Sequence, residues 1–428
     1  MVRMVHWPLP MERQLIKLGL ERMQELLQHL GNPHDQMPPT IHIAGTNGKG
    51  STIAFMKAIL EASGLKVHVY TSPHLVRFNE RIVLAGEQIA DNYLYQLLEE
   101  CRIIAEQHDM QVSFFEGITA AAFLAFARTK ADILLLETGL GGRLDATNII
   151  SKPIITIITP ISLDHVNILG NTLTKIAYEK ACIMKPCTPC VVSMQEPESH
   201  VVIAKYADNV GALLVRLEYD FGILFEGDQI YYKADDYKFK FPQLSLSGDH
   251  QYINAASAIA AIKLLKGVVI PDDVINYGLL HASWPGRLQQ ITYGKIHNLL
   301  LKNWEIWLDG AHNHGGAIVI AHWLKTKQDT PVYMIMGITK GRDIKNILRP
   351  FAGILTQVIG VTVQSEPLSY SGNVIVKHAQ ELGLNAIVKN DVEDAILYLK
   401  AHITYNKVRI IITGSLFLIA DALVYNQN

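Results

Sequence analysis

The chain has 428 residues, of which 49% are hydrophobic and 18% are charged, and its formal net charge is -2. A chain of this length exceeds what one hydrophobic core usually serves, and this composition can bury a large core, so we expect two globular domains. The nearly balanced charge produces no overall field that would favour nucleic acid or an anionic membrane. We therefore expect neither as a partner.

The N-terminal residues MVRMVHWPLPMERQ lack the apolar segment and cleavage site of a signal peptide, and the longest apolar stretch, residues 118–127, is too short to span a bilayer. Four cysteines argue against a disulfide framework and suit the reducing cytoplasm. Cys187 and Cys190 form a lone C-x-x-C, which we interpret as buried thiols at the start of a strand rather than as a metal or redox site. We predict a cytoplasmic protein.

Apolar runs rich in β-branched residues and bounded by glycine and proline recur along the first half of the chain. Continuous runs of this kind are typical of strands buried on both faces. Amphipathic helical patterns lie between them; Ile53, Met56 and Leu60, for example, share one helical face. The alternation of strand and helix predicts a parallel, doubly wound α/β sheet. Its expected strands are residues 40–44, 66–71, 132–137, 153–159 and 189–194.

The pattern changes at residues 221–246 to short alternating segments such as QIYYKADDYKFKF, which predict a small antiparallel appendage to that sheet. A helix is expected at residues 252–265. After the turn at Pro285 and Gly286 the strand–helix alternation restarts, which indicates a second, smaller α/β domain. We place the boundary within residues 288–298, with domains at 1–291 and 292–428. The strands expected in the second domain are residues 305–308, 332–337, 357–363, 385–388 and 408–413.

The segment IHIAGTNGKGST lies where a buried strand turns into an amphipathic helix. Glycines let backbone N–H groups approach phosphate oxygens, the helix N-terminus adds partial positive charge, and Lys49 can reach the terminal phosphates. The spacing departs from G-x-x-x-x-G-K-[ST], because Gly50 separates Lys49 from Ser51; a glycine-rich turn with a surface lysine is the alternative. We predict an ATP-binding phosphate loop formed by Gly45, Thr46, Asn47, Gly48, Lys49, Gly50 and Ser51.

Eight motifs follow one another in the order GTNGKGST, TSPHLVRFNERI, ETGLGGRLDATN, SLDHVNILG, EKACIMK, WPGRLQ, DGAHN and ITGSLFL. This series resembles the folylpolyglutamate synthase and dihydrofolate synthase family, which belongs with the Mur ligases, over roughly residues 18–420. The resemblance implies an N-terminal P-loop domain and a C-terminal Rossmann-like domain. It also implies a reaction in which ATP phosphorylates a pteroate or folate carboxylate and L-glutamate displaces the phosphate to form an amide.

By this resemblance, Ser72 in TSPH and Glu137 bind one Mg²⁺, and His165 in SLDH binds a second. Glu137 also ends a buried strand, at the edge where ligands of open α/β sheets gather, although a strand-end carboxylate in solvent is the alternative. Taken alone, His165 is typical of a hydrogen-bonded loop histidine, because imidazole is an uncommon Mg²⁺ ligand.

Lys180 in EKACI matches the lysine that the family carries as a carbamate, and we assign it a catalytic role. Carbamylation turns a cation into a carboxylate-like anion that can orient Mg²⁺ or a phosphate-bound water. An unmodified helix lysine paired with Glu179 is the alternative. Two positions depart from the family pattern: Cys182 replaces the glycine of EKAGI, and His314 stands where proline is more frequent.

The segments SFFEGIT and GLGGRLDATN resemble the family's pterin site. An aromatic ring can stack on a flat pterin and a carboxylate can accept its paired N–H groups, although Phe115 taken alone is typical of a core residue. The dihydropteroate contacts implied in this way are Ser113, Phe115, Leu144, Asp145 and Ala146.

For the nucleotide, the resemblance implies an adenine contact at Asn254, a phosphate contact at Arg287 and a ribose contact at Asp309. His312 and Ser415 resemble positions near the incoming glutamate and the transferred phosphate. We assign His312 to catalysis and Ser415 to substrate binding.

The LDA triplet resembles family members with dihydrofolate synthase activity, so we predict a bifunctional, monomeric enzyme. One alternative is a Mur-type amino-acid ligase with another acceptor. A second is a nucleotide-binding module that has lost catalysis, against which Glu137, His165 and Lys180 argue. The resemblance also makes a monovalent cation a candidate cofactor.

Overall fold

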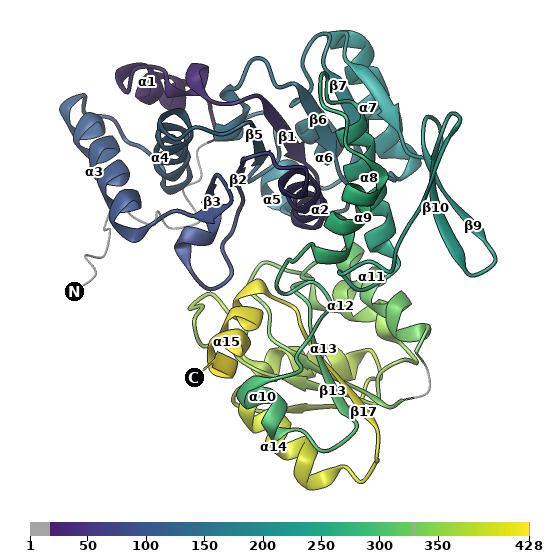
Figure 1. The fold of residues 1–428 in the computed structure, drawn as a ribbon. Coiled ribbons are helices and arrows are strands. Elements are labelled where there is room, and N and C mark those ends of the chain that lie inside the picture. Colours follow the sequence, from purple (N-terminus) through teal and green to yellow (C-terminus); the bar gives the residue numbers. More distant parts are fainter. Residues whose placement is uncertain (1–17, 328–329, 428) are drawn as a thin grey trace. The chain divides into compact units, whose positions relative to one another are not determined.

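The computed structural model describes residues 18–327 and 330–427, and the chain divides into two compact units (Figure 1). Unit 1 comprises residues up to Ser245 together with Tyr252–Ser283, and unit 2 comprises Leu246–Gln251 together with the residues from Trp284 onward. The main division between the units follows Ser283, on the N-terminal side of position 291. The short segment Leu246–Gln251 also belongs to unit 2. The N-terminal residues MVRMVHWPLPMERQ lie outside the described residues. Among the described helices, none is long and apolar enough to cross a membrane.

Unit 1 is built on an eight-stranded sheet with the order β4-β3-β2-β5-β1-β6-β7-β8. The six strands from β2 to β8 pair in parallel, which confirms the doubly wound sheet. β3 and β4 add an antiparallel edge, so the sheet is mixed. The strands are β1 (Thr40–Ala44), β2 (Val67–Tyr70), β3 (Ile82–Leu84), β4 (Glu87–Gln88), β5 (Ile133–Glu137), β6 (Ile155–Ile158), β7 (Pro189–Val192) and β8 (Leu213–Arg216).

Helices cover both faces of this sheet, because alternate strand residues point to opposite sides. Leu134 and Leu136 join the core formed with α1 (Glu21–His29), α3 (Asp91–Gln107) and α4 (Phe114–Arg128). On the same side, Ala44 and Ile158 join a core with α6 (Leu173–Ala181) and α7 (Pro197–Val210). On the other side, α2 (Lys49–Ala62) contacts β2 and β5 and packs against α9 (Asp272–His281). Short helical segments are η2 (Pro33–Gln36), η3 (Phe78–Arg81), η4 (Ala146–Ile149) and α5 (Val166–Leu169).

The contact between α2 and α9 is a close approach of two helix backbones. A Cβ atom at Gly278 would lie 2.5 Å from Ile59 Cγ1 and 2.6 Å from Ile59 Cα. No side chain fits there unless the helices separate. α2 carries the phosphate loop at its N-terminus, so this packing holds the loop's helix in place.

The predicted antiparallel segments are present as β9 (Gly222–Glu226), β10 (Gln229–Ala234) and β11 (Tyr237–Lys240). They form a small three-stranded sheet of their own beside the large one. Figure 1 shows β9 and β10 as a projecting ribbon. The following helix, α8 (His250–Lys263), begins two residues before its predicted start.

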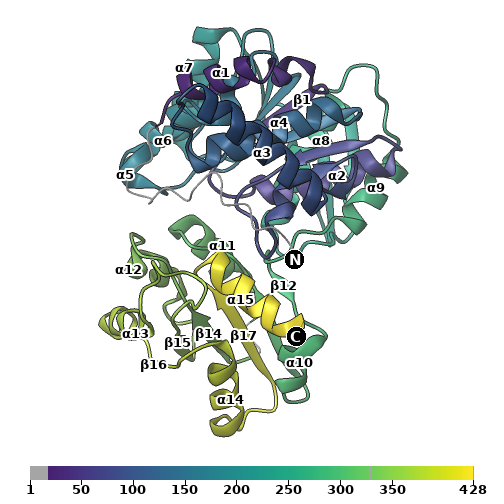
Figure 2. The ribbon, with the colours of Figure 1, turned by 90° about the vertical axis from the view of Figure 1, so that its left-hand side faces the viewer.

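Unit 2 contains a six-stranded sheet with the order β12-β13-β17-β14-β15-β16, in which only β12 is antiparallel to its neighbour (Figure 2). Its strands are β12 (Gln289–Gln290), β13 (Trp304–Leu308), β14 (Val332–Met336), β15 (Gln357–Gly360), β16 (Ala386–Val388) and β17 (Val408–Thr413). Its helices are α10 (Gly294–Leu299), α11 (His314–Lys325), α12 (Ile344–Leu348), η5 (Arg349–Phe351), α13 (Gly372–Glu381), α14 (Val392–His402) and α15 (Leu416–Gln427). The five predicted strands are all present.

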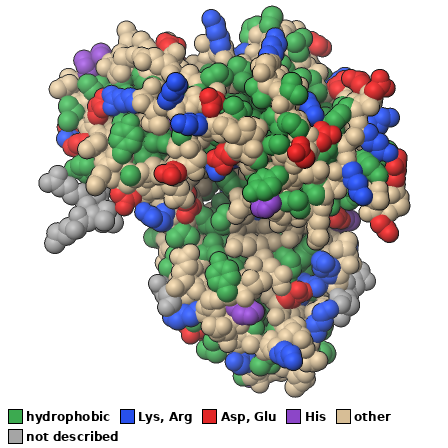
Figure 3. Space-filling model, viewed as in Figure 1, with side chains coloured by type: hydrophobic (Ala, Val, Ile, Leu, Met, Phe, Trp, Pro, Cys, Tyr) green, Lys and Arg blue, Asp and Glu red, His purple; other side chains and the backbone are tan. Residues whose placement is uncertain are grey.

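Charged side chains of both signs are interspersed over the described surface that Figure 3 shows. This distribution agrees with 38 basic and 40 acidic residues in the chain. A mixed surface of this kind provides no long-range attraction for a polyanion, so an anionic ligand must be held by local groups.

Gly278→Ala should destabilise unit 1, because the added methyl group pushes α9 away from α2. We expect a loss of about 1–3 kcal/mol in the free energy of unfolding, even though alanine is the better helix former. Denaturant unfolding followed by circular dichroism measures the change. Gly222→Ala is the matched control: a Cβ there meets nothing within 4 Å, and its effect should stay within about 0.5 kcal/mol. Equal stability of the two variants would contradict the prediction.

Candidate active site

The phosphate loop joins β1 to α2, and two of its glycines adopt positive φ. At Gly45, φ is 153° and a Cβ atom would lie 1.8 Å from Thr159 Oγ1; at Gly48, which caps α2, φ is 86°. The Thr46 and Asn47 N–H groups donate to the Pro160 carbonyl at 3.0 and 3.1 Å, which ties the loop to the segment after β6. The loop thus brings glycine backbone to the start of a 14-residue helix, an arrangement suited to binding phosphate.

Two lysines converge on one backbone oxygen of this loop. Lys49 Nζ donates to the Gly45 carbonyl at 3.1 Å, and Lys180 Nζ, from α6, donates to the same carbonyl at 2.8 Å. Lys49 Nζ also lies 3.6 Å from Glu137 Oε1. Burial, followed by the charge of Lys49, lowers the pKa of Lys180 to about 7. Lys180 is therefore a poorly solvated amine that loses its proton near neutral pH.

Residues distant in sequence complete the loop's surroundings. A Cβ at Gly48 would lie 2.5 Å from Asn254 Oδ1, so α8 places buried Asn254 directly against the loop. Asn47 Nδ2 donates to Ser162 Oγ at 3.0 Å, and Thr46 Oγ1 donates to the Ser162 carbonyl at 3.2 Å. Ser162 was not predicted as a site residue; its only signal in the sequence is its place at the start of the SLDH motif.

Ser72 and Glu137, which the resemblance implies as ligands of one Mg²⁺, are neighbours in the structure. The Ser72 N–H donates to Glu137 Oε2 at 3.2 Å, and Glu137 is buried at the carboxyl end of β5. His165 lies three residues beyond Ser162, in the left-handed conformation with φ of 50°, and its side chain is 44% exposed with Nε2 3.9 Å from Asp164 Oδ1. Across the described residues, no group of three His, Cys, Asp or Glu side chains is arranged to hold a metal.

The predicted pterin residues of SFFEGIT lie at the start of α4. Ser113 caps the helix: its Oγ accepts the Glu116 N–H at 3.3 Å, and Glu116 Oε2 accepts the Ser113 N–H at 2.8 Å. The half-buried ring of Phe115 covers Gly139, where a Cβ would lie 2.3 Å from Phe115 Cζ. Phe115 also stands 6.2 Å from the Tyr70 ring. The helix cap thus presents a half-exposed aromatic ring beside the end of β5.

Asp145 organises the loop GLGGRLDATN from within. Its Oδ2 accepts the Leu140 N–H at 2.7 Å and its Oδ1 accepts the Thr147 N–H at 3.0 Å, and burial raises the pKa of this carboxyl group. Leu144 is half-buried and Ala146 is buried beside it. The hydrogen bonds of Asp145 hold the loop's shape, a role that the prediction of a direct pterin contact did not include.

In unit 2, Asp309 follows β13 and is buried. It accepts the Leu288 N–H at 2.9 Å and the Ala311 N–H at 2.8 Å, and burial raises the pKa of its carboxyl group. Arg287 Nη1 donates to the Gly286 carbonyl at 3.3 Å. A Cβ at Gly310 would lie 2.7 Å from Arg287 Nη1, so Arg287 and Asp309 occupy the same loop cluster.

His312 and Ser415 reach this cluster from two neighbouring strands. His312 Nδ1 donates to the Gly310 carbonyl at 2.9 Å. Ser415 follows β17, and its Oγ accepts the Phe417 N–H at 3.2 Å. Since β13 and β17 are adjacent and parallel, their carboxyl ends bring the two residues to one edge of the sheet.

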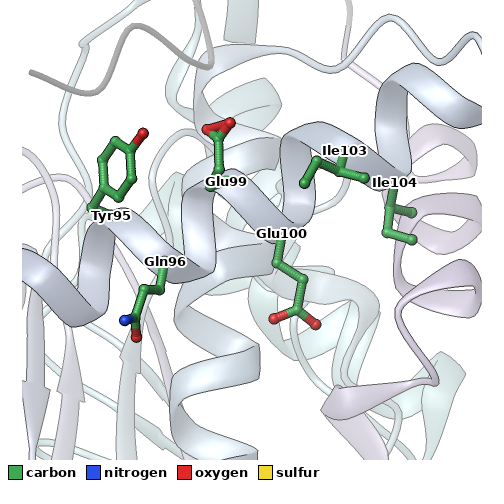
Figure 4. Close-up of a pocket in the computed structure, with 6 residues that line it drawn as sticks. All are labelled: Tyr95, Gln96, Glu99, Glu100, Ile103 and Ile104. Atoms are coloured by element: carbon green, nitrogen blue, oxygen red, sulfur yellow. The ribbon is translucent and has the colours of Figure 1, made fainter. Parts of the chain in front are cut away.

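A hollow on the outer face of α3 shares no residue with these clusters. Figure 4 shows its lining residues, with Glu99 and Glu100 pointing away from each other. Arg102 lies 2.5 Å from Glu99 and Arg128 lies 2.6 Å from Glu100, so both carboxylates are already paired. The lining residues are Tyr95, Gln96, Glu99, Glu100, Ile103 and Ile104.

Two family matches cover most of the chain: residues 43–262 match the Mur ligase middle domain, and residues 289–425 match the dihydrofolate synthetase C-terminal domain. The dihydrofolate synthase/folylpolyglutamate synthase of Bacillus subtilis is 34% identical over 95% of this chain and 94% of that protein. The chain belongs to the folylpolyglutamate synthase and dihydrofolate synthase family of Mur ligases. It is an ATP-dependent ligase.

Solved structures of the same family share its fold. Escherichia coli FolC in complex with DHPP and ADP is 28% identical and superposes with a TM-score of 0.85, over 96% of this chain and 94% of that one. Mycobacterium tuberculosis folylpolyglutamate synthase complexed with ADP and AMPPCP is 27% identical and superposes with a TM-score of 0.85, over 96% of both chains. The folylpolyglutamate synthase of Lacticaseibacillus casei is 33% identical over 93% of this chain and 92% of that protein.

The departures from the family's motifs fit the structure. Cys182 follows α6 with φ of -65°, so this turn does not require the glycine of EKAGI. His314 is the first residue of α11, a position that proline favours but many residues occupy. The interpretation of the C-x-x-C as two buried thiols is wrong for Cys187, which is exposed because its turn, with φ of 57°, precedes β7; Cys190 is buried within that strand.

Gly45→Ala should abolish ATP binding, because the new methyl group would overlap Thr159 and force the loop open. Titration with a fluorescent ATP analogue measures the affinity, with Gly222→Ala as the control. Adding Thr159→Gly to Gly45→Ala removes the two closest atoms and should restore part of the affinity. Wild-type affinity in Gly45→Ala alone would refute this account of the loop.

Proposed function

We propose that the chain adds L-glutamate to dihydropteroate and to the glutamate tail of folates, through an acyl phosphate formed from ATP. The observation that carries this proposal is the convergence of Lys49, Lys180 and Glu137 at the Gly45 carbonyl, beside the Ser72 backbone. The relatives from Bacillus subtilis and Escherichia coli are named for both activities.

The acceptor's carboxylate is a poor electrophile, so it must first receive a phosphate leaving group. Phosphoryl transfer between two anions requires cations that neutralise both and a frame that aligns them. Lys49 is placed to contact the terminal phosphate. Ser72 and Glu137 would hold one Mg²⁺ and His165 a second, and the open set of protein ligands at this edge fits cations that also bind phosphate. Bound Mg²⁺ would neutralise phosphate charge during transfer.

Lys180 is proposed to act as a carbamate. An amine with a pKa of about 7 is largely unprotonated at pH 8, so its lone pair can form an N–C bond to CO₂ with release of one proton. The product carries a negative charge close to Lys49, which replaces a repulsion between two cations by an attraction. Such a group would then orient a metal-bound ligand.

The other residues implied by the resemblance are proposed to take the family's roles. Asn254, which lies against the phosphate loop, would contact adenine, and Arg287 and Asp309 would bind phosphate and ribose. His312 and Ser415 would lie near the incoming glutamate and the transferred phosphate, His312 in catalysis and Ser415 in substrate binding. The division of labour between domains 1–291 and 292–428, a monomeric state, a cytoplasmic location and a monovalent cation are proposed on the same basis.

Pterin recognition is proposed for Ser113, Phe115, Leu144, Asp145 and Ala146. Phe115 offers a half-exposed ring for stacking, and Asp145 shapes the loop that would enclose the pterin. The LDA triplet supports dihydropteroate as one acceptor. A Mur-type ligase with another acceptor is the competing function.

Purified protein with ATP, Mg²⁺ and L-glutamate should release phosphate when dihydropteroate or tetrahydrofolate is added. Release that depends on both glutamate and acceptor is measured with a coupled phosphate assay, and UDP-muramoyl peptide serves as the control acceptor. Release with tetrahydrofolate alone would overturn bifunctionality. Phosphate release with the muramoyl peptide alone would support the Mur-type function instead.

Lys180→Ala should lose most of the activity, and short carboxylic acids such as formate should restore part of it. Wild-type activity should fall in CO₂-free buffer and return with bicarbonate, and this dependence should grow as the pH falls toward 7, because protonated Lys180 does not react with CO₂. The variant rescued by formate should be insensitive to bicarbonate. Full activity of Lys180→Ala would refute the carbamate.

A further inference from the structure

Arg81 is a buried cation that the site described so far does not use. It ends η3, its side chain is only 7% exposed, and its Nε donates to His74 Nδ1 at 2.9 Å. Within the described residues, its guanidinium makes no ion pair with a carboxylate. A buried charge without a partner is costly, so natural proteins rarely retain one unless a ligand supplies the opposite charge.

Glu80, the residue before Arg81, uses its carboxylate to bind backbone N–H groups. Glu80 accepts the N–H groups of Leu75, Val76 and Arg77 at 2.7, 3.1 and 2.8 Å, and in this way it holds the preceding turn. Its carboxylate is therefore occupied by backbone donors. Burial lowers the pKa of Arg81, and the charges of Glu137 and Glu80 offset this effect only in part. A guanidinium can bind a planar acceptor such as a carboxylate in bidentate fashion.

Aromatic rings flank the guanidinium. Its central carbon lies 5.5 Å from the centre of the Phe78 ring and 5.9 Å from that of Phe114, and the two rings lie 6.3 Å apart. Both rings are half-buried. Cation–π contacts at these distances stabilise the arginine in part. They also surround the cation with flat apolar surface, against which an aromatic ligand can pack.

Arg81 adjoins the proposed metal ligands. The Thr71 N–H donates to the Arg81 carbonyl at 3.0 Å, and the next residue, Ser72, donates its N–H to Glu137. Strand β2 is paired with β5 up to Tyr70 and Leu136, so both strands end at this place. A carboxylate held by Arg81 would thus lie beside the residues that face the terminal phosphate.

We propose that Arg81 binds the reacting carboxylate of the acceptor and selects acceptors in which an aromatic ring accompanies it. This inference rests on the proposed function and names a residue of that same site. The guanidinium neutralises the acceptor's charge, which lowers the repulsion between the carboxylate and the phosphate it attacks. Phe78 and Phe114 contact the acceptor's ring, while His74 holds Arg81 in position.

The test compares two ligands, pteroate and its neutral carboxamide, by equilibrium titration in the presence of Mg²⁺ and ADP. Wild-type protein should prefer pteroate by about 10- to 100-fold, the ratio typical of one charge-assisted bidentate contact. In Arg81→Gln this preference should vanish while ADP affinity stays unchanged. A merely structural arginine would weaken both ligands equally and leave their ratio intact, and that result would overturn the proposal.

Arg81→Lys covers the case in which Arg81→Gln does not fold, since lysine keeps the charge but not the planar fork. It should retain part of the preference and raise the KM for dihydropteroate more than it lowers kcat; an unchanged preference and KM would overturn the proposal. Arg128→Gln, which removes a surface arginine paired with Glu100, is the control and should behave as wild type. If wild-type protein bound neither ligand and released no phosphate with dihydropteroate, the proposed function itself would fail; binding without a preference for pteroate would defeat only the role of Arg81.

Discussion

The charge balance at the Gly45 carbonyl governs the rest of the phosphate-binding site. One backbone oxygen receives the amino groups of both half-buried Lys49 and buried Lys180. A single carbonyl dipole does not neutralise two cations in such surroundings. Two features reduce this excess of positive charge: Glu137 lies close to Lys49, and the pKa of Lys180 is lowered to about 7. Phosphate oxygens would supply the anionic charge that the protein itself provides only in part.

The same demand for close approach explains the glycines of the loop. Its carbonyl reaches both lysines only because the backbone at Gly45 lies against Thr159, where no Cβ fits. Asn254 packs just as closely over Gly48. Backbone shape and charge placement are therefore a single constraint, and a methyl group at either glycine would disturb the electrostatics along with the geometry.

Much of the fold follows from local pattern, because strands covered by helices on both faces leave uninterrupted apolar runs. β1 and β17 were predicted residue for residue, and the other predicted strands to within two residues at each end, except that β15 ends three residues earlier than predicted. β3 and β4 were missed because strands of three and two residues are too short to show a period. β8 was missed because Leu213 at its start is exposed, as at a sheet edge.

The site residues likewise differ in whether local sequence could predict them. The phosphate loop could be predicted because all its chemistry lies in seven consecutive residues, whereas Lys180 meets Gly45 across 135 positions and entered only through the resemblance. Ser162 and Arg81 escaped prediction altogether. Serine and arginine in a loop carry no periodic signal, and whether an arginine has a carboxylate partner is a property of three-dimensional neighbours.

The packing of α9 on α2 has a consequence for how the protein is made. α2 ends at Ala62 and its covering helix begins at Asp272, so during translation the apolar side of α2 waits for everything between them. At ordinary elongation rates that interval is on the order of 10–40 s. The nascent chain carries an unfinished nucleotide-binding layer throughout this interval, a period in which exposed apolar surface favours aggregation.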